Sequence, residues 1–244
     1  MKKLIYLSII MLTIVAQVDA KKRKAEVITK AQYGISEQGT SLVLKMDKGK
    51  KHNHPLMAIW LADSTGQYIQ TLYVAESIGK GYFDRSVNAK GKWQPGATLR
   101  PATLPFWAYQ RGIKNDVGNF MPTQNNPVVD AYTGATPPGS FELTLVTDKP
   151  LSGKYKIMME INQSWDWNEF WFNDKFPEDK EYKTSSQPAV IYEAVIDTQK
   201  PQSTVQLIAV GRSHHSGQDG KMYTDLNTLT TALQIVKKAT ITIK

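Results

Sequence analysis

Short runs of aliphatic, aromatic and β-branched residues recur along the chain, and turn-forming residues separate them. Several runs alternate apolar and polar side chains, which is the pattern of a strand with one buried face. We predict strands at residues 56–62, 68–75, 141–147, 155–161, 190–197, 205–210 and 240–243. Short strands at this spacing favour an all-β fold, an immunoglobulin-like antiparallel β-sandwich with long loops.

Turn residues between the predicted strands indicate how they connect. The Asp-Ser-Thr-Gly turn at 63–66 and the Lys-Pro-Leu-Ser-Gly turn at 149–153 each predict a hairpin between the flanking strands. Two connections, 78–128 and 162–188, are much longer than a turn. Loops of that length in a compact β domain usually carry function or have structure of their own.

A single short helix is predicted near the C-terminus. Leu233, Ile235 and Val236 recur near helical spacing, and residues 230–231 offer a threonine N-cap. The lysine pair at 237–238 suits the negative end of the helix dipole. We expect this helix to cover one edge or end of the sandwich.

The N-terminus has the three parts of an export signal. Lys2 and Lys3 precede a largely apolar run of thirteen residues at 4–16, and small residues lead to Ala20. An uncleaved membrane anchor is the alternative, but the run is shorter than the roughly 20 residues that a spanning helix needs. We expect a signal peptide at 1–20, cleavage after Ala20, a single β-sandwich domain at 21–244 with no transmembrane segment, and a periplasmic or secreted location.

Composition narrows the classes of function. The chain has no cysteine, which excludes disulfides, thiolate metal sites and a cysteine-linked lipid. Its formal net charge is +8, but the lysines are scattered, so we do not predict a nucleic-acid partner. Neither a Gly-x-Ser-x-Gly elbow nor a glycine-rich phosphate loop is present, and we do not expect a self-contained enzyme.

Residues 127–136 contain a candidate site of covalent modification, in which Asp130 precedes Thr133, Gly134, Ala135 and Thr136. The run resembles the acceptor signature of proteins that carry covalent flavin mononucleotide (FMN). The resemblance implies that the Thr136 hydroxyl is esterified by the flavin phosphate, that a flavin transferase attaches it, and that the other four residues present it. The alternative is a structural turn before the next strand, because two prolines follow Thr136 at 137–138.

A wider resemblance covers roughly residues 55 to 210. The Ala-Ile-Trp-Leu-Ala-Asp run at 58–63, the Leu-Pro-Phe-Trp run at 104–107 and the acceptor-like run, followed by Gly-Lys-Tyr at 153–155, are similar to a bacterial periplasmic family, domain of unknown function 2271. That resemblance implies an immunoglobulin-like sandwich. It also implies association with flavin transferases and membrane redox proteins.

The segment 164–174 holds three of the six tryptophans, at Trp165, Trp167 and Trp171. An aromatic platform can stack on a flavin, a sugar or a quinone, and the alternative is that these rings form the loop's own core. Acidic and amide side chains between them would suit Ca²⁺, although the spacing is not that of a regular calcium loop.

All four histidines occur in two close pairs, His52 with His54 and His214 with His215. Imidazoles bind zinc or copper, but neighbours on a strand point to opposite faces. We therefore expect a polar loop at 211–220 and assign no metal to these residues.

Taken together, these features predict an exported accessory protein of flavin-linked redox chemistry, with FMN on Thr136. Two other classes stay open. One is a binding module for a glycan, an envelope component or a protein, which uses the aromatic segment without a cofactor. The other is a metal-handling protein built on the histidine pairs.

Overall fold

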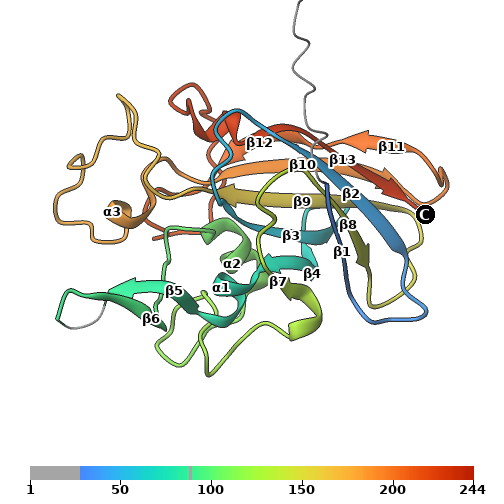
Figure 1. The fold of residues 1–244 in the computed structure, drawn as a ribbon. Coiled ribbons are helices and arrows are strands. Elements are labelled where there is room, and N and C mark those ends of the chain that lie inside the picture. The colour runs from blue at the N-terminus through green and yellow to red at the C-terminus, as the bar shows by residue number, and fades with distance from the viewer. Residues whose placement is uncertain (1–27, 88–89) are drawn as a thin grey trace, which may run out of the picture.

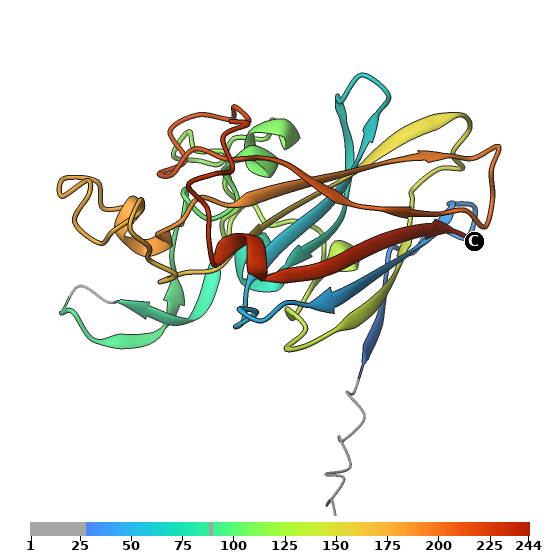
Figure 2. The same ribbon diagram turned by 90° about the horizontal axis from the view of Figure 1, so that it is seen from above.

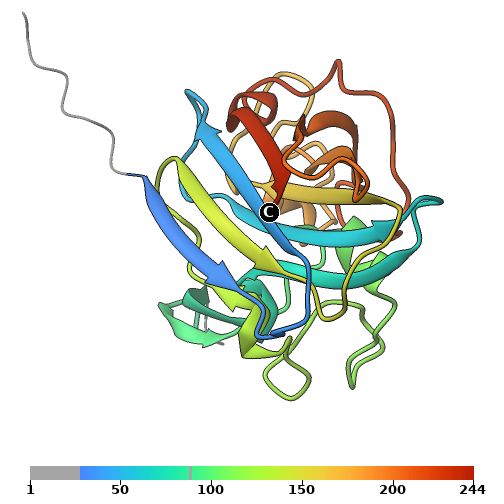
Figure 3. The ribbon, with the colours of Figure 1, turned by 90° about the vertical axis from the view of Figure 1, so that its right-hand side faces the viewer.

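The computed structural model describes residues 28–87 and 90–244, so the predicted signal peptide lies outside the described residues. Two sheets pack face to face (Figures 1 and 3). Sheet A has the order β1 (Thr29–Tyr33), β8 (Phe141–Val146), β2 (Ser41–Lys48), β13 (Val236–Ile243) and β11 (Thr204–Gln206). Sheet B has the order β12 (Ile208–Arg212), β10 (Val190–Asp197), β9 (Lys154–Asn162), β3 (Leu56–Asp63), β4 (Tyr68–Ala75) and β7 (Thr133–Gly134).

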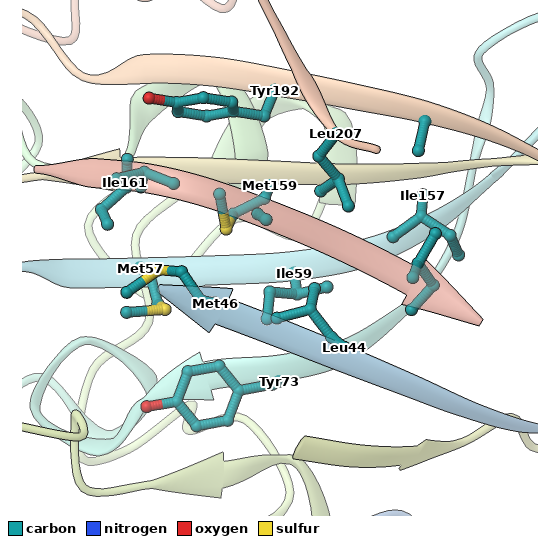
Figure 4. Close-up of a cluster of buried hydrophobic side chains, with 14 of the residues drawn as sticks. Leu44, Met46, Met57, Ile59, Tyr73, Ile157, Met159, Ile161, Tyr192 and Leu207 are labelled. Atoms are coloured by element: carbon teal, nitrogen blue, oxygen red, sulfur yellow. The ribbon is translucent and has the colours of Figure 1, made fainter. Parts of the chain in front are cut away.

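The predicted all-β sandwich is confirmed, and most of its strand pairs are antiparallel. The exceptions are β1 with β8 and β4 with β7, which pair parallel at sheet edges. Apolar side chains from both inner faces fill the space between the sheets, including Leu44 and Met46 of β2 and Ile59 of β3 (Figure 4). Burial of each such side chain contributes roughly 1.5–3 kcal/mol relative to exposure. The alternation in β8, buried at every second residue, is the sequence pattern expected of this packing.

Sheet B is buried on its outer face as well. The chain between β4 and β8 contains α1 (Glu76–Lys80), β5 (Tyr82–Val87), β6 (Trp93–Ala97), α2 (Pro105–Arg111) and η1 (Asp130–Tyr132). A second hydrophobic cluster, with Trp60 of β3 and Trp107 of α2, lies between this insertion and the sheet. Because β3 is covered on both faces, its sequence reads as an unbroken apolar run.

A buried carboxyl group attaches the insertion to the sheet. Glu160 of β9 is fully buried, and its two oxygens accept hydrogen bonds from the backbone N–H groups of Phe106 and Trp107, at 3.2 and 2.7 Å. The Trp107 indole N–H donates to the hydroxyl of Thr71 on β4 at 3.0 Å. Burial raises the pKa of Glu160 to about 8, against the opposing effect of the two N–H donors and Ser213.

Two predicted connections differ from the structure. The predicted hairpin at 149–153 is wrong, because β8 belongs to sheet A and β9 to sheet B, so this turn crosses between the sheets. The backbone N–H of Leu151 donates to the Thr40 hydroxyl at 2.8 Å, which ties the turn to the start of β2. The hairpin at 63–66 is confirmed, since β3 and β4 pair antiparallel.

The C-terminal helix is shorter than its sequence pattern indicates. A single 3-10 turn, η2 (Ala232–Gln234), lies at the predicted position, and the lysines at 237–238 belong to β13. One further helix, α3 (Tyr182–Ser185), lies in the connection between β9 and β10. Among the described residues, no helix is long and apolar enough to cross a membrane.

The buried Glu160 predicts a pH dependence of stability. Its folded pKa of about 8 lies above the unfolded value of 4.5, so the native state binds the proton more tightly and stability falls as pH rises through this interval. Glu160→Gln keeps the side-chain shape and removes the titration. We expect the unfolding free energy of the wild type to fall relative to that of the variant between pH 5 and 8, by up to about 1.4 kcal/mol per pH unit.

Urea unfolding at several pH values measures this difference directly. Parallel pH profiles for the wild type and Glu160→Gln would contradict the assignment of a proton to the buried carboxyl group.

Candidate functional site

Three adjoining hollows form one groove on the insertion side of the protein. The aromatic hollow, of about 770 Å³, is lined by Asp84, Arg85, Trp93, Gln94, Arg100 and Trp165. The central hollow, of about 640 Å³, is lined by Asn53, His54, Ser77, Asp84, Arg85 and Arg100. The threonine hollow, of about 370 Å³, is lined by Glu76, Ser77, Lys80, Asp84, Ala135 and Thr136. Because neighbouring hollows share lining residues, we treat them together as the groove.

The aromatic hollow is built by two segments that are distant in sequence. The β5–β6 hairpin supplies Trp93, and the connection between β9 and β10 supplies Trp165. Both segments extend beyond the same end of the sandwich, away from the C-terminus (Figures 1 and 2). The two residues are 59% and 67% exposed, so the hollow presents two large apolar side chains to solvent.

The backbone at Trp165 is held in an unfavourable conformation. Its φ is +72°, in the left-handed region that costs a bulky residue about 1–3 kcal/mol. The next residue is fixed by a half-buried network: the Asp166 N–H donates to the Ser186 hydroxyl at 2.8 Å, and that hydroxyl donates to the Asp166 carboxylate at 2.7 Å. Burial raises the pKa of Asp166 to about 7. The network therefore fixes the backbone directly after Trp165, whose side chain is exposed.

Contacts at the base of the groove hold the Arg100 side chain in place. Its guanidinium lies 4.0 Å from the centre of the Phe83 ring and donates to the backbone carbonyl of Arg85 at 3.0 Å. Phe83 belongs to the second hydrophobic cluster, so the arginine rests on a packed base. Burial lowers the pKa of Arg100 from its usual value, but an arginine stays charged at neutral pH.

The acceptor-like residues lie at the other end of the groove. Ala135 and Thr136 line the threonine hollow, while Thr133 and Gly134 form the edge strand β7. Thr136 is half-buried. Asp130 is mostly exposed and pairs with Lys80 at 3.3 Å, and the same ammonium contacts Glu76 at 2.8 Å.

The turn that contains Thr136 is held by packing. The Tyr73 hydroxyl donates to the carbonyls of Gly134 and Ala135 at 3.2 and 3.3 Å. The Tyr33 ring occupies the space that a side chain at position 134 would need. Gly134 is therefore required by the close approach of a tyrosine ring, independently of any modification.

Trp167 and Trp171 of the aromatic segment pack against the protein. Trp171 is buried, and Trp167 lies edge-on to Tyr182 with ring centres 5.5 Å apart. The Asn168 side-chain amide donates to the Thr228 carbonyl at 2.9 Å, and its oxygen accepts a hydrogen bond from the backbone N–H of Trp171 at 2.7 Å. Of the three tryptophans in this segment, Trp165 lines the groove.

The histidine pairs have separate surroundings. His214 and His215 stack on each other with ring centres 4.2 Å apart, because they lie in a loop where strand alternation does not apply. Phe176 stacks on His215, and burial lowers the pKa of that imidazole to about 4. His54, at φ +52°, lines the central hollow, and His52 lies against the Pro137 carbonyl at 3.3 Å. Within residues 28–87 and 90–244, no group of three or more potential ligands is arranged to bind a metal.

Sequence reasoning missed Asp84, Arg85, Trp93 and Arg100. The available signal was a lone tryptophan between Lys92 and Gln94, which is an unusual place for a large apolar side chain unless it is presented to a ligand. Comparison of the chain with models of protein families, with curated proteins and with solved structures finds no match. The functional argument therefore depends on the geometry of the groove.

Replacing the exposed Trp165 and replacing the buried Trp171 should change stability by very different amounts. Trp165→Gly removes little buried surface and relieves the left-handed backbone, so the unfolding free energy should change by less than about 1 kcal/mol. Trp171→Ala removes a buried ring and should cost about 3–5 kcal/mol. Denaturant unfolding measures both, and a loss of several kcal/mol in Trp165→Gly would make Trp165 a packing residue.

Proposed function

We propose that the protein is an exported, non-enzymatic binding module, periplasmic or secreted, whose ligand is a carbohydrate. The observation that carries this proposal is the exposure of Trp93 and Trp165 in one hollow. A pyranose ring has a flat face of C–H groups that contacts an indole face, and its hydroxyls need polar partners at the rim. Asp84, Gln94 and Ser164 line the groove and can supply them.

The shape of the groove favours a chain of rings over a compact cofactor. Pockets for small cofactors enclose most of the ligand surface. Here the two tryptophans are more than half exposed, and the aromatic hollow continues directly into the central hollow. An open, elongated site with aromatic contacts at one end can accept successive units of an oligosaccharide.

Tryptophan substitutions test carbohydrate binding. Trp93→Ala and Trp165→Ala should each lower the affinity for a bound oligosaccharide about tenfold, which corresponds to about 1.4 kcal/mol. Phe172→Ala is the matched control, because Phe172 is an exposed aromatic residue of the same segment that does not line the groove. Calorimetric titration after a screen of soluble oligosaccharides provides the affinities. Equal affinities for all four proteins would contradict the proposal.

Flavin carriage is the second candidate, and the position of Thr136 favours it. The residue lines a hollow that adjoins the rest of the groove, so FMN linked to its hydroxyl would have space beside the chain. In that role a flavin transferase and a membrane redox protein would be the partners. Glu76 and Asp84 line the same hollow as Thr136, and their carboxylates disfavour a phosphate ester there, which is why this candidate is second.

Mass measurement tests flavin attachment. After coexpression with an active flavin transferase, the tryptic fragment 115–154 should carry FMN in the wild type and in Thr136→Ser, and should be unmodified in Thr136→Val, because the ester needs a hydroxyl. An unmodified wild-type fragment beside a modified positive-control substrate would remove this candidate and leave Thr136 as a turn residue.

A further inference from the structure

The lining of the aromatic hollow carries more positive than negative charge. Arg85 and Arg100 both line it, and neither forms an ion pair within the described residues. The single carboxylate in its lining is Asp84.

The Arg100 guanidinium is prepared to receive an anion. Stacking on Phe83 and the bond to the Arg85 carbonyl fix its plane, so little side-chain entropy is lost when a ligand binds. A guanidinium has five N–H donors, and among the described residues Arg100 donates one hydrogen bond, to the Arg85 carbonyl. The remaining donors can bind a carboxylate or a sulfate in the paired geometry that these groups share.

Charge changes sign along the groove. The threonine hollow is lined by Glu76 and Asp84, and its Lys80 is paired with two carboxylates, Glu76 and Asp130. An anionic ligand is therefore attracted to the tryptophan end and repelled at the threonine end. This gradient places the charged units of a chain against Arg85, Arg100 and the two indole rings.

Resting on the carbohydrate-binding function proposed above, we infer that the ligand is an acidic oligosaccharide, whose uronate carboxylates or sulfate esters bind Arg85 and Arg100 while its rings stack on Trp93 and Trp165. A single-stranded nucleic acid also combines anions with flat rings. It is disfavoured because a DNA strand has no free sugar hydroxyls along its length to donate to the Asp84 carboxylate, which lines the same hollow. The free hydroxyls of an oligosaccharide can donate to that carboxylate.

Matched pairs of oligosaccharides test the charge requirement. The probes are oligogalacturonate and its full methyl ester, and a heparin hexasaccharide and its unsulfated counterpart; each pair keeps the rings and changes the anion. Calorimetry or indole fluorescence should give at least tenfold tighter binding to at least one charged member, with an affinity that falls as salt is raised. A dT12 oligonucleotide is included to test nucleic acid.

Variants separate the two contributions. Arg85→Gln should weaken binding of the charged probe about tenfold and leave the neutral member unchanged, whereas Trp165→Ala should weaken both. Arg100→Lys keeps the charge and loses the paired geometry, so its effect should be smaller than that of Arg100→Gln. Arg111→Gln is the matched control, because Arg111 lies over an aromatic ring, as Arg100 does, but is outside the groove.

Each outcome has one interpretation. Equal binding of charged and neutral members, with an effect of Trp165→Ala, would overturn the acidic-ligand inference and leave the carbohydrate function standing. Tighter binding of dT12 than of every sugar, or no binding of any sugar in either pair, would contradict both.

Discussion

The carboxyl group of Glu160 connects the sandwich to the part of the chain that carries the groove. It lies in the middle of sheet B, on the face turned away from sheet A, and accepts hydrogen bonds from backbone N–H groups at the start of α2. A buried polar group without partners costs about 1–3 kcal/mol or more. Any docking of the insertion that left the Glu160 carboxyl without hydrogen-bond donors would therefore be less stable. The second hydrophobic cluster forms around that attachment and includes Phe83, the base on which Arg100 rests. The position of the groove thus depends on how the insertion is fixed to one strand.

The opposite wall of the groove depends on a different polar network. Asp166, Ser186 and Gln187 bond to one another at the base of the aromatic segment, where Ser186 also has a left-handed backbone, at φ +78°. One strained residue, Ser186, belongs to this network, and another, Trp165, directly precedes Asp166, so the hydrogen bonds of the network hold an unfavourable local backbone. The aromatic segment is divided in its roles: Trp171 is buried and packs beside Tyr182, whereas Trp165 is exposed and lines the groove.

Much of the sandwich could be predicted from sequence because its strands follow simple periodicity. The bounds of β4 and β10 agree with the alternation of apolar residues, and β3 was recognisable from its apolar run. Strands β5 and β6 were not predicted, since Asp84 and Arg85 interrupt any alternation and Phe83 of β5 is held by tertiary packing in the second hydrophobic cluster. The sequence did not predict that the 149–153 turn crosses between the sheets, because the residues of a turn do not determine which sheet the next strand joins.

The groove was harder to predict than the fold because its residues come from segments brought together by tertiary packing. Trp165 was included within the aromatic segment, but Trp93 lies 72 positions earlier and has no shared motif with it. The sequence also does not show that Arg85 and Arg100 lie beside those two rings. The acceptor-like run at 130–136 shows the converse case, where a sequence motif is visible and the structure supplies packing reasons for part of it, such as Tyr33 against Gly134.

The central claim is that Trp93 and Trp165 belong to one ligand-binding surface. Titration of the protein with the tightest-binding oligosaccharide, followed through the indole N–H signals of all six tryptophans, tests it most directly. The account predicts that the signals of Trp93 and Trp165 shift together with one dissociation constant, while those of the buried Trp60, Trp107 and Trp171 stay in place. Movement of only one of the two exposed tryptophans, or shifts confined to the buried ones, would contradict it.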